Sequence, residues 1–162
     1  MGLQNWLVVT SVALALSAVG QRAAGADFAL KSTAQYNLGP NKVALSGYDP
    51  VGYFTKNAPF KGKKELSAEH HGVTYYFASE ENRKLFSEAP EKYLPTYGGW
   101  CATAMAKDEK VEVDPTNFKV TNGRLFLFFK AFYADALKEW NKDEANLTTK
   151  ADANWKKISA TR

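Results

Sequence analysis

The chain has 162 residues, of which 45% are hydrophobic and 14% aromatic, with 21 basic and 17 acidic side chains and a formal net charge of +4. The charges are interspersed and form no basic stripe, which argues against nucleic acid or an anionic membrane surface as a partner. The single cysteine, Cys101, excludes an internal disulfide. In an oxidising compartment such a thiol is buried, paired between chains or chemically used.

The first residues predict export. Leu7 to Val19 is a mostly apolar run, shorter than the roughly 20 residues that span a bilayer. Ala24-Gly25-Ala26 then supplies the small-x-small pattern of a signal peptidase site. We therefore expect residues 1–26 to be a signal peptide and the remaining chain to be soluble, secreted or periplasmic, and of single-domain size. An uncleaved anchor is the alternative, because no Lys or Arg precedes the apolar run.

The first elements expected in chain order are short. Residues 27–42 read as an extended polar lead-in, and Val43–Leu45 as a short strand. Pro50 is well placed to begin a short helix with Asp49 as its cap. Lys61–Lys64 is expected to be an exposed basic loop.

A hairpin and a helix follow. The arms Leu66–His70 and Val73–Phe77 flank a His71-Gly72 turn, and the second arm is rich in β-formers. Ser79 with the acidic residues after it predicts a capped helix over Glu80–Glu88. Pro90 should stop that helix, and residues 90–93 should form one more turn.

The second half predicts a further hairpin between helices. The stretch after Gly98-Gly99 should be helical to about Lys107, and Val111–Val113 and Phe118–Thr121 should be strands. Asn122-Gly123 is a strong type I′ hairpin signal, with residues 124–129 as the returning arm. Apolar spacing from Phe132 to Trp140 predicts an amphipathic helix, and a last polar helix contains Ala151, Trp155 and Ile158. The chain therefore predicts one α+β domain over 43–158, built of short antiparallel hairpins packed with several helices.

Several of these strings resemble the exported YHS domain proteins. Gly47–Phe54 (GYDPVGYF) is similar to their G-Y-D-P-V-A-Y-F, Gly72–Ser79 (GVTYYFAS) to G-x-x-Y-x-F-x-S, and Tyr97–Ala102 (YGGWCA) to Y-G-G-x-C-A. Shorter matches continue to Ala151–Trp155. The resemblance covers about Val43 to Trp155, with the motifs in the right order.

The resemblance implies a metal-binding module. In relatives attached to metal-handling proteins the ligands are cysteines, in D-P-V-C and in Y-F-C-S-x-x-C. The corresponding positions here are Gly52, Ala78 and Asn82, so the family's cysteine site is not carried over. Cys101 remains, in a motif of the exported branch.

The residues themselves offer one soft-ligand set. Cys101 and Met105 are spaced i, i+4, which places both sulfurs on one helix face. His70 and His71 lie at a predicted hairpin tip, and because strand neighbours point to opposite faces, one of them, with His70 preferred, would join. Thiolate, thioether and imidazole together favour copper over hard cations. The alternative is that Cys101 and Met105 fill the core and the histidines are solvated turn residues.

An acidic and aromatic set is the second candidate. Its members, expected to line a polar pocket for a small ligand or a protein partner, are Tyr48, Asp49, Tyr53, Tyr97, Trp100 and Asp114. The alternative is that both aspartates cap turns or helices, as Asp before Pro usually does.

We therefore expect an exported protein that binds a soft metal, with copper as the expected cofactor, for sensing, storage or delivery through a site around Cys101. The alternative is a metal-free module that uses the region of Tyr48, Asp49, Tyr97 and Trp100. No enzyme is expected, because the chain has no C-x-x-C, Gly-rich phosphate loop or H-E-x-x-H. Neither nucleic acid nor a membrane span after signal cleavage is expected, and redox use of the thiol in a disulfide-linked dimer is a third idea.

Overall fold

The computed structural model describes residues 33–160, so the predicted signal peptide and the first part of the lead-in lie outside the described residues. Its strands pair as three antiparallel hairpins. These are β1 (Lys63–His70) with β2 (Val73–Phe77), β3 (Asp114–Thr121) with β4 (Arg124–Phe128), and β5 (Lys130–Ala131) with β6 (Ala134–Asp135). The α-helices are α1 (Pro50–Thr55), α2 (Glu80–Glu88), α3 (Ala102–Met105), α4 (Ala136–Trp140) and α5 (Glu144–Ala160). Between them lie the 3-10 turns η1 (Thr33–Gln35), η2 (Pro40–Lys42), η3 (Leu45–Gly47), η4 (Pro90–Tyr93) and η5 (Thr96–Gly99). The predicted α+β class is confirmed, and within 33–160 no helix is both long and apolar enough to cross a membrane.

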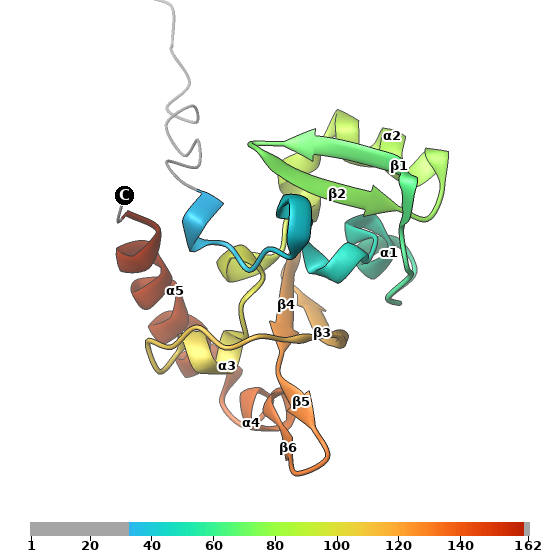
Figure 1. The fold of residues 1–162 in the computed structure, drawn as a ribbon. Coiled ribbons are helices and arrows are strands. Elements are labelled where there is room, and N and C mark those ends of the chain that lie inside the picture. The colour runs from blue at the N-terminus through green and yellow to red at the C-terminus, as the bar shows by residue number, and fades with distance from the viewer. Residues whose placement is uncertain (1–32, 161–162) are drawn as a thin grey trace, which may run out of the picture.

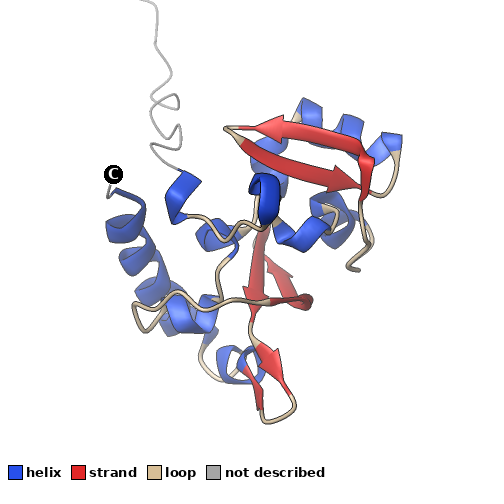
Figure 2. Ribbon diagram, viewed as in Figure 1, coloured by secondary structure: helices blue, strands red, loops and turns tan. Residues whose placement is uncertain are grey.

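Strand β4 separates two hydrophobic cores. The β1–β2 hairpin lies with α1 and α2 at one end of the molecule, and α4 lies with the β5–β6 hairpin at the other (Figures 1 and 2). Successive side chains of a strand point to opposite faces. Leu125 and Leu127 accordingly join the first core, whereas Phe126 and Phe128 join the second, with Met105. One short strand thus forms a wall of both cores.

Local capping explains the two helices of the first half. The Asp49 carboxylate accepts the Val51 N–H at 2.8 Å, and Pro50 occupies the first turn of α1, where its missing N–H costs nothing. The Ser79 hydroxyl accepts the Asn82 N–H at 3.1 Å and so begins α2. Both caps agree with the sequence prediction.

Both predicted two-residue hairpin turns are confirmed. His71 and Gly72 have φ angles of 51° and 74°, and Asn122 and Gly123 have φ angles of 50° and 71°. Positive φ at both central residues is the type I′ pattern, which matches the twist of the flanking strands.

Several local predictions differ from the structure. The lead-in expected to be extended contains the 3-10 turns η1 and η2 in its described part. Val43 and Ala44 form isolated bridges, to Thr74 and Leu38, and Leu45 begins a 3-10 turn instead of continuing a strand, because Leu45 and the following serine have positive φ. Residues 111–113 are not a strand, and β3 begins at Asp114. Lys63 and Lys64 belong to β1 rather than to a loop.

The helix expected to begin at Phe132 begins four residues later. Phe132 and Tyr133 form the turn between β5 and β6, and α4 begins at Ala136. Asp135 caps it by accepting the Leu137 N–H at 3.2 Å. The apolar spacing was real, but a cap inside the segment and pairing of Lys130 with Asp135 compete with helix formation there.

Gly62 lies close to the backbone of β2, and replacing it with a larger residue tests that contact. A Cβ at this position would lie 2.5 Å from the backbone carbon of Tyr76, whereas a Cβ at Gly39 would lie 3.6 Å from its nearest neighbour, the Val43 oxygen. We expect Gly62→Ala to lower the free energy of unfolding by about 1–3 kcal/mol. Gly39→Ala, the matched control, should change it by less than about 0.5 kcal/mol. Urea unfolding measures both, and equal losses would contradict the close approach.

Candidate functional site

The turn between β1 and β2 brings both histidines together. Because His71 adopts positive φ, the alternation of a strand does not apply, and the His70 and His71 ring centroids lie 3.9 Å apart. The expectation that one histidine would face away is therefore wrong. Nε2 of His70 lies 2.8 Å from Oε1 of Glu91, and Nε2 of His71 lies 3.4 Å from the same oxygen.

These three side chains form a potential metal site, which we call the His70–His71–Glu91 cluster. One ligand atom from each lies within 4.8 Å of the others. The exposed side-chain fractions are 19% for His70, 37% for His71 and 71% for Glu91, so an ion could reach the cluster from solvent. Glu91 was not anticipated from the sequence, because it comes from η4, twenty residues away.

Packing fixes the position of the cluster. The His70 ring meets Phe86 of α2 edge-on, with centroids 6.1 Å apart, and Phe86 is buried in the first core. Pro90 follows α2 and begins η4, which places Glu91 beside the turn.

Burial, and after it the Glu91 charge, raise the pKa of Tyr36 to about 12. Tyr36 therefore remains a neutral phenol at physiological pH.

Cys101 lies elsewhere, at the border of the second core. It is 1% exposed, and its Sγ accepts the Phe129 N–H at 3.3 Å. Met105 is fully buried in the second core. Cys101 does not belong to the group of His, Cys, Asp and Glu side chains that converge within residues 33–160. It lines a cavity of about 230 Å³ with Thr103 and Phe129.

The acidic and aromatic candidates hold the fold together through internal hydrogen bonds. Asp49 is fully buried and accepts three of them: from the Val51 N–H at 2.8 Å, the Ala78 N–H at 2.8 Å and the Asn82 side chain at 2.7 Å. The Tyr53 hydroxyl donates to the Pro115 carbonyl at 2.9 Å.

Tyr53 has close acidic and aromatic neighbours. Burial above all, and then Tyr48, Asp114 and Asp49, raise its pKa. Lys61 lies over the Tyr48 ring, with Nζ 4.0 Å from the centroid. The Asp114 carboxylate accepts the Thr116 N–H at 2.9 Å. These members of the second set lie near one another.

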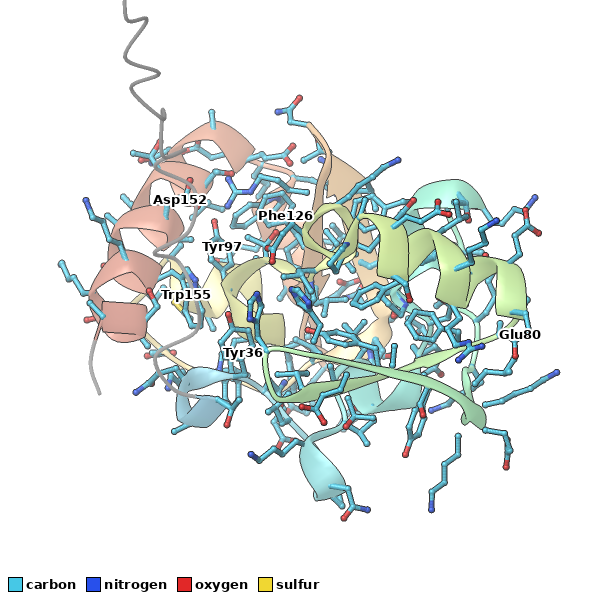
Figure 3. The ribbon with its side chains drawn as sticks, turned by 90° about the horizontal axis from the view of Figure 1, so that it is seen from above. Tyr36, Glu80, Tyr97, Phe126, Asp152 and Trp155 are labelled. Carbon is cyan, nitrogen blue, oxygen red and sulfur yellow. The ribbon has the colours of Figure 1, made fainter. Side chains whose placement is uncertain are left out.

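Tyr97 and Trp100 belong to a different region. The Tyr97 hydroxyl donates to Asp152 of α5 at 2.9 Å, and the Trp100 indole N–H donates to the Gln35 carbonyl at 2.8 Å. Figure 3 shows Tyr97, Asp152 and Trp155 at the α5 end, away from Glu80 at the start of α2. The structure therefore does not gather the whole set into one pocket.

One comparison with known proteins matches a part of the chain to a domain family. Residues 51–97 match the model of the YHS domain family, and this segment contains α1, the β1–β2 hairpin, α2 and η4. This part of the chain therefore resembles a YHS domain, a type of domain to which metal binding is ascribed. The His70–His71–Glu91 cluster lies inside the matched segment, and Cys101 lies outside it.

One further similarity is local. The chain is 36% identical over 62 residues to eukaryotic peptide chain release factor subunit 1 of Cryptosporidium hominis. That stretch covers 38% of this chain and 14% of the relative, so the chain spans a small part of the relative's length. No solved structure matches the chain.

Gly52, Ala78 and Asn82 stand where the resemblance places cysteines in relatives, and in this structure they make other contacts. Asp49 accepts hydrogen bonds from the backbone of Ala78 and the side chain of Asn82. A Cβ on Gly52 would lie 2.7 Å from the Phe60 ring. Two of the three positions therefore donate hydrogen bonds to the buried Asp49 carboxylate instead of supplying thiolates.

The two Asp-Pro pairs allow a matched test of Asp49. Asp49→Ala leaves the buried Val51 N–H, the partly buried Ala78 N–H and the Asn82 amide without their acceptor, so we expect a loss on the order of 3 kcal/mol in the free energy of unfolding. Asp114 also precedes a proline but is less buried, at the start of β3, so Asp114→Ala should lose less than about 1 kcal/mol. Chemical denaturation measures both, and a similar loss for both variants would contradict the proposed role of Asp49.

Burial of Cys101 predicts that its thiol reacts slowly with reagents in solution. We expect a soluble thiol reagent to modify the native protein at least about a hundredfold more slowly than the urea-unfolded chain, because access requires local opening. Absorbance of the released chromophore measures both rates. Comparable rates would show that the adjacent cavity admits solutes to the sulfur.

Proposed function

We propose that this protein is an exported, non-catalytic metal-binding protein that holds copper(II), or a similar borderline cation, at the His70–His71–Glu91 cluster. The observation that carries this proposal is the convergence of two imidazoles and one carboxylate within 4.8 Å. The match of residues 51–97 to the YHS domain supports metal binding in general. The signal-like N-terminus supports export.

The donor set suits a borderline metal. Ligand atoms of a tetrahedral site with metal–nitrogen distances near 2 Å lie roughly 3.3 Å apart. The contacts from His71 and His70 to Glu91 are 3.4 and 2.8 Å, so the first already fits and the second needs a small expansion. Imidazole suits copper and zinc, and among divalent ions copper(II) binds such donors most tightly.

Three protein ligands leave part of the coordination sphere open. The cluster is also partly exposed, so a bound ion could be handed on to another ligand. Both features favour sensing, storage or delivery of the metal over a structural role. They do not require a reaction at the site, and the proposal therefore includes no enzyme activity.

A soft site at Cys101 is less well supported. Its sulfur already accepts a backbone hydrogen bond, Met105 is buried among apolar side chains, and neither histidine is close in the fold. The metal-free alternative is also weaker, since Asp49, Tyr53 and Tyr97 have internal partners.

The test is a copper(II) titration of residues 27–162, which contain every described element, with zinc(II) in parallel. We expect one ion to bind at about micromolar affinity or tighter. His70→Ala, His71→Ala and Glu91→Gln should each weaken binding about tenfold or more, because each removes a ligand. Affinity should also fall on acidification, because protons compete for the imidazoles.

Two variants serve as controls. Glu88→Gln removes an exposed carboxylate on the neighbouring α2 and should leave the affinity unchanged. Cys101→Ser should also leave it unchanged. Loss of binding in Cys101→Ser alone would show that Cys101, and not the His70–His71–Glu91 cluster, binds the metal. Absence of binding in the unaltered chain would favour the metal-free module.

A further inference from the structure

The turn between β3 and β4 joins an asparagine to a glycine at the surface. Asn122 and Gly123 have φ angles of 50° and 71°, both are exposed, and a Cβ placed on Gly123 would meet nothing within 4 Å. The register pairs Thr121 with Arg124, so both turn residues lie outside the strand ladder. A type I′ turn requires positive φ at both central residues, which Asn and Gly adopt at the least cost. Local conformation alone thus accounts for the presence of this residue pair.

The same pair of residues is chemically reactive. The side-chain carbonyl carbon of an asparagine lies within reach of the backbone nitrogen of the following residue, and attack by that nitrogen closes a five-membered imide. A side chain on the following residue hinders the approach, whereas glycine has no Cβ and the widest range of backbone angles. Asn122-Gly123 is the only Asn-Gly pair in the sequence.

Two other asparagines show what distinguishes Asn122. Asn41 and Asn57 are exposed and also have positive φ, of 56° and 48°. They precede Lys42 and Ala58, so a side chain stands beside the backbone nitrogen that would attack. Exposure and φ are thus matched at the three asparagines, and of the three only Asn122 is followed by glycine.

We propose that Asn122 is a site of spontaneous deamidation, at which the backbone nitrogen of Gly123 displaces the side-chain amide without an enzyme. The bond from this nitrogen to Cγ of Asn122 forms and the Cγ–Nδ2 bond breaks. The amide leaves as ammonia, with the proton that the Gly123 nitrogen loses. Water then opens the imide at one of its two carbonyl carbons. Opening at Cγ gives aspartate, and opening at the backbone carbonyl carbon gives isoaspartate, whose main chain runs through the former side chain.

Both products change the hairpin that contains the site. Each places a carboxylate at the turn, where it competes for Arg124, which pairs with Asp152 of α5 at 2.6 Å. Isoaspartate also adds one carbon to the main chain of a two-residue loop, whose length fixes the register of β3 with β4. Because alternate side chains of β4 fill both cores, a disturbed register costs packing on both sides of the strand. The proposal does not depend on metal binding.

Peptide mapping of the aged protein tests the proposal. Residues 27–162 are incubated at mildly alkaline pH and digested under mildly acidic conditions, and mass spectrometry then locates each exchange of an amide for a carboxyl group. We expect Asn122 to convert at least about tenfold faster than Asn41 and Asn57, because only its following residue lacks a Cβ. The rate should rise with pH, because the attacking nitrogen must lose its proton. An isoaspartyl-specific methyltransferase should label the same peptide.

Gly123→Ala is the matched variant, since it keeps Asn122 and places a Cβ beside the attacking nitrogen. It should slow conversion at least about tenfold, and the comparison is repeated in urea so that a change of fold in the variant is separated from the chemistry. Conversion of Asn122 no faster than that of Asn41 and Asn57, or an equal rate in Gly123→Ala in urea, would overturn the proposal.

Urea unfolding of the isoaspartate fraction, separated from the aged protein by its charge, measures the effect on the hairpin. We expect its midpoint to lie below that of the unmodified chain, because the longer turn no longer fits the register of β4. An equal midpoint would contradict this effect.

Discussion

The buried carboxylate of Asp49 is the contact on which the first half of the structure depends. Burying a charge is costly unless donors replace the lost water, and here three donors from α1, the end of β2 and α2 do so. The link fixes where α2 begins relative to the hairpin. The position of α2 in turn determines where Pro90 ends it and where η4 places Glu91. The geometry of the His70–His71–Glu91 cluster thus follows from a polar contact at the far end of α2.

Strand β4 determines how the two hydrophobic cores are arranged, because it forms a wall of both. Its alternating side chains fill one core with leucines and the other with phenylalanines. The second core is closed by α5. There Asp152 pairs with Arg124 of β4 at 2.6 Å, and the Arg124 guanidinium lies 4.9 Å from the centroid of the Phe126 ring. Cys101 and Met105 belong to this side, and the histidines to the other. A site that combines all four ligands would have to cross the wall between the cores.

Two surface features could not be derived from the sequence, for different reasons. The histidine pair was recognised, but strand alternation was applied to it, although the glycine that follows signals a turn in which His71 has positive φ. Glu91 could not have been assigned, because nothing in its neighbourhood distinguishes it from other exposed glutamates. Phe132 and Tyr133 fit a helical period, and the cap at Asp135 and the pairing of β5 with β6 exclude that helix.

The sequence by itself determined the features that act over a few residues: the caps at Asp49 and Ser79, the type I′ turns at His71-Gly72 and Asn122-Gly123, and the α+β class with its resemblance to YHS domains. These depend on local hydrogen bonds and backbone preferences, which neighbouring residues specify. Only the tertiary structure decided which side chains meet. It joined Glu91 to the histidines, tied Tyr97 to Asp152, buried Cys101 and exposed Phe132 and Tyr133. Such contacts are set by how two separate cores pack against β4, and no local pattern records that packing.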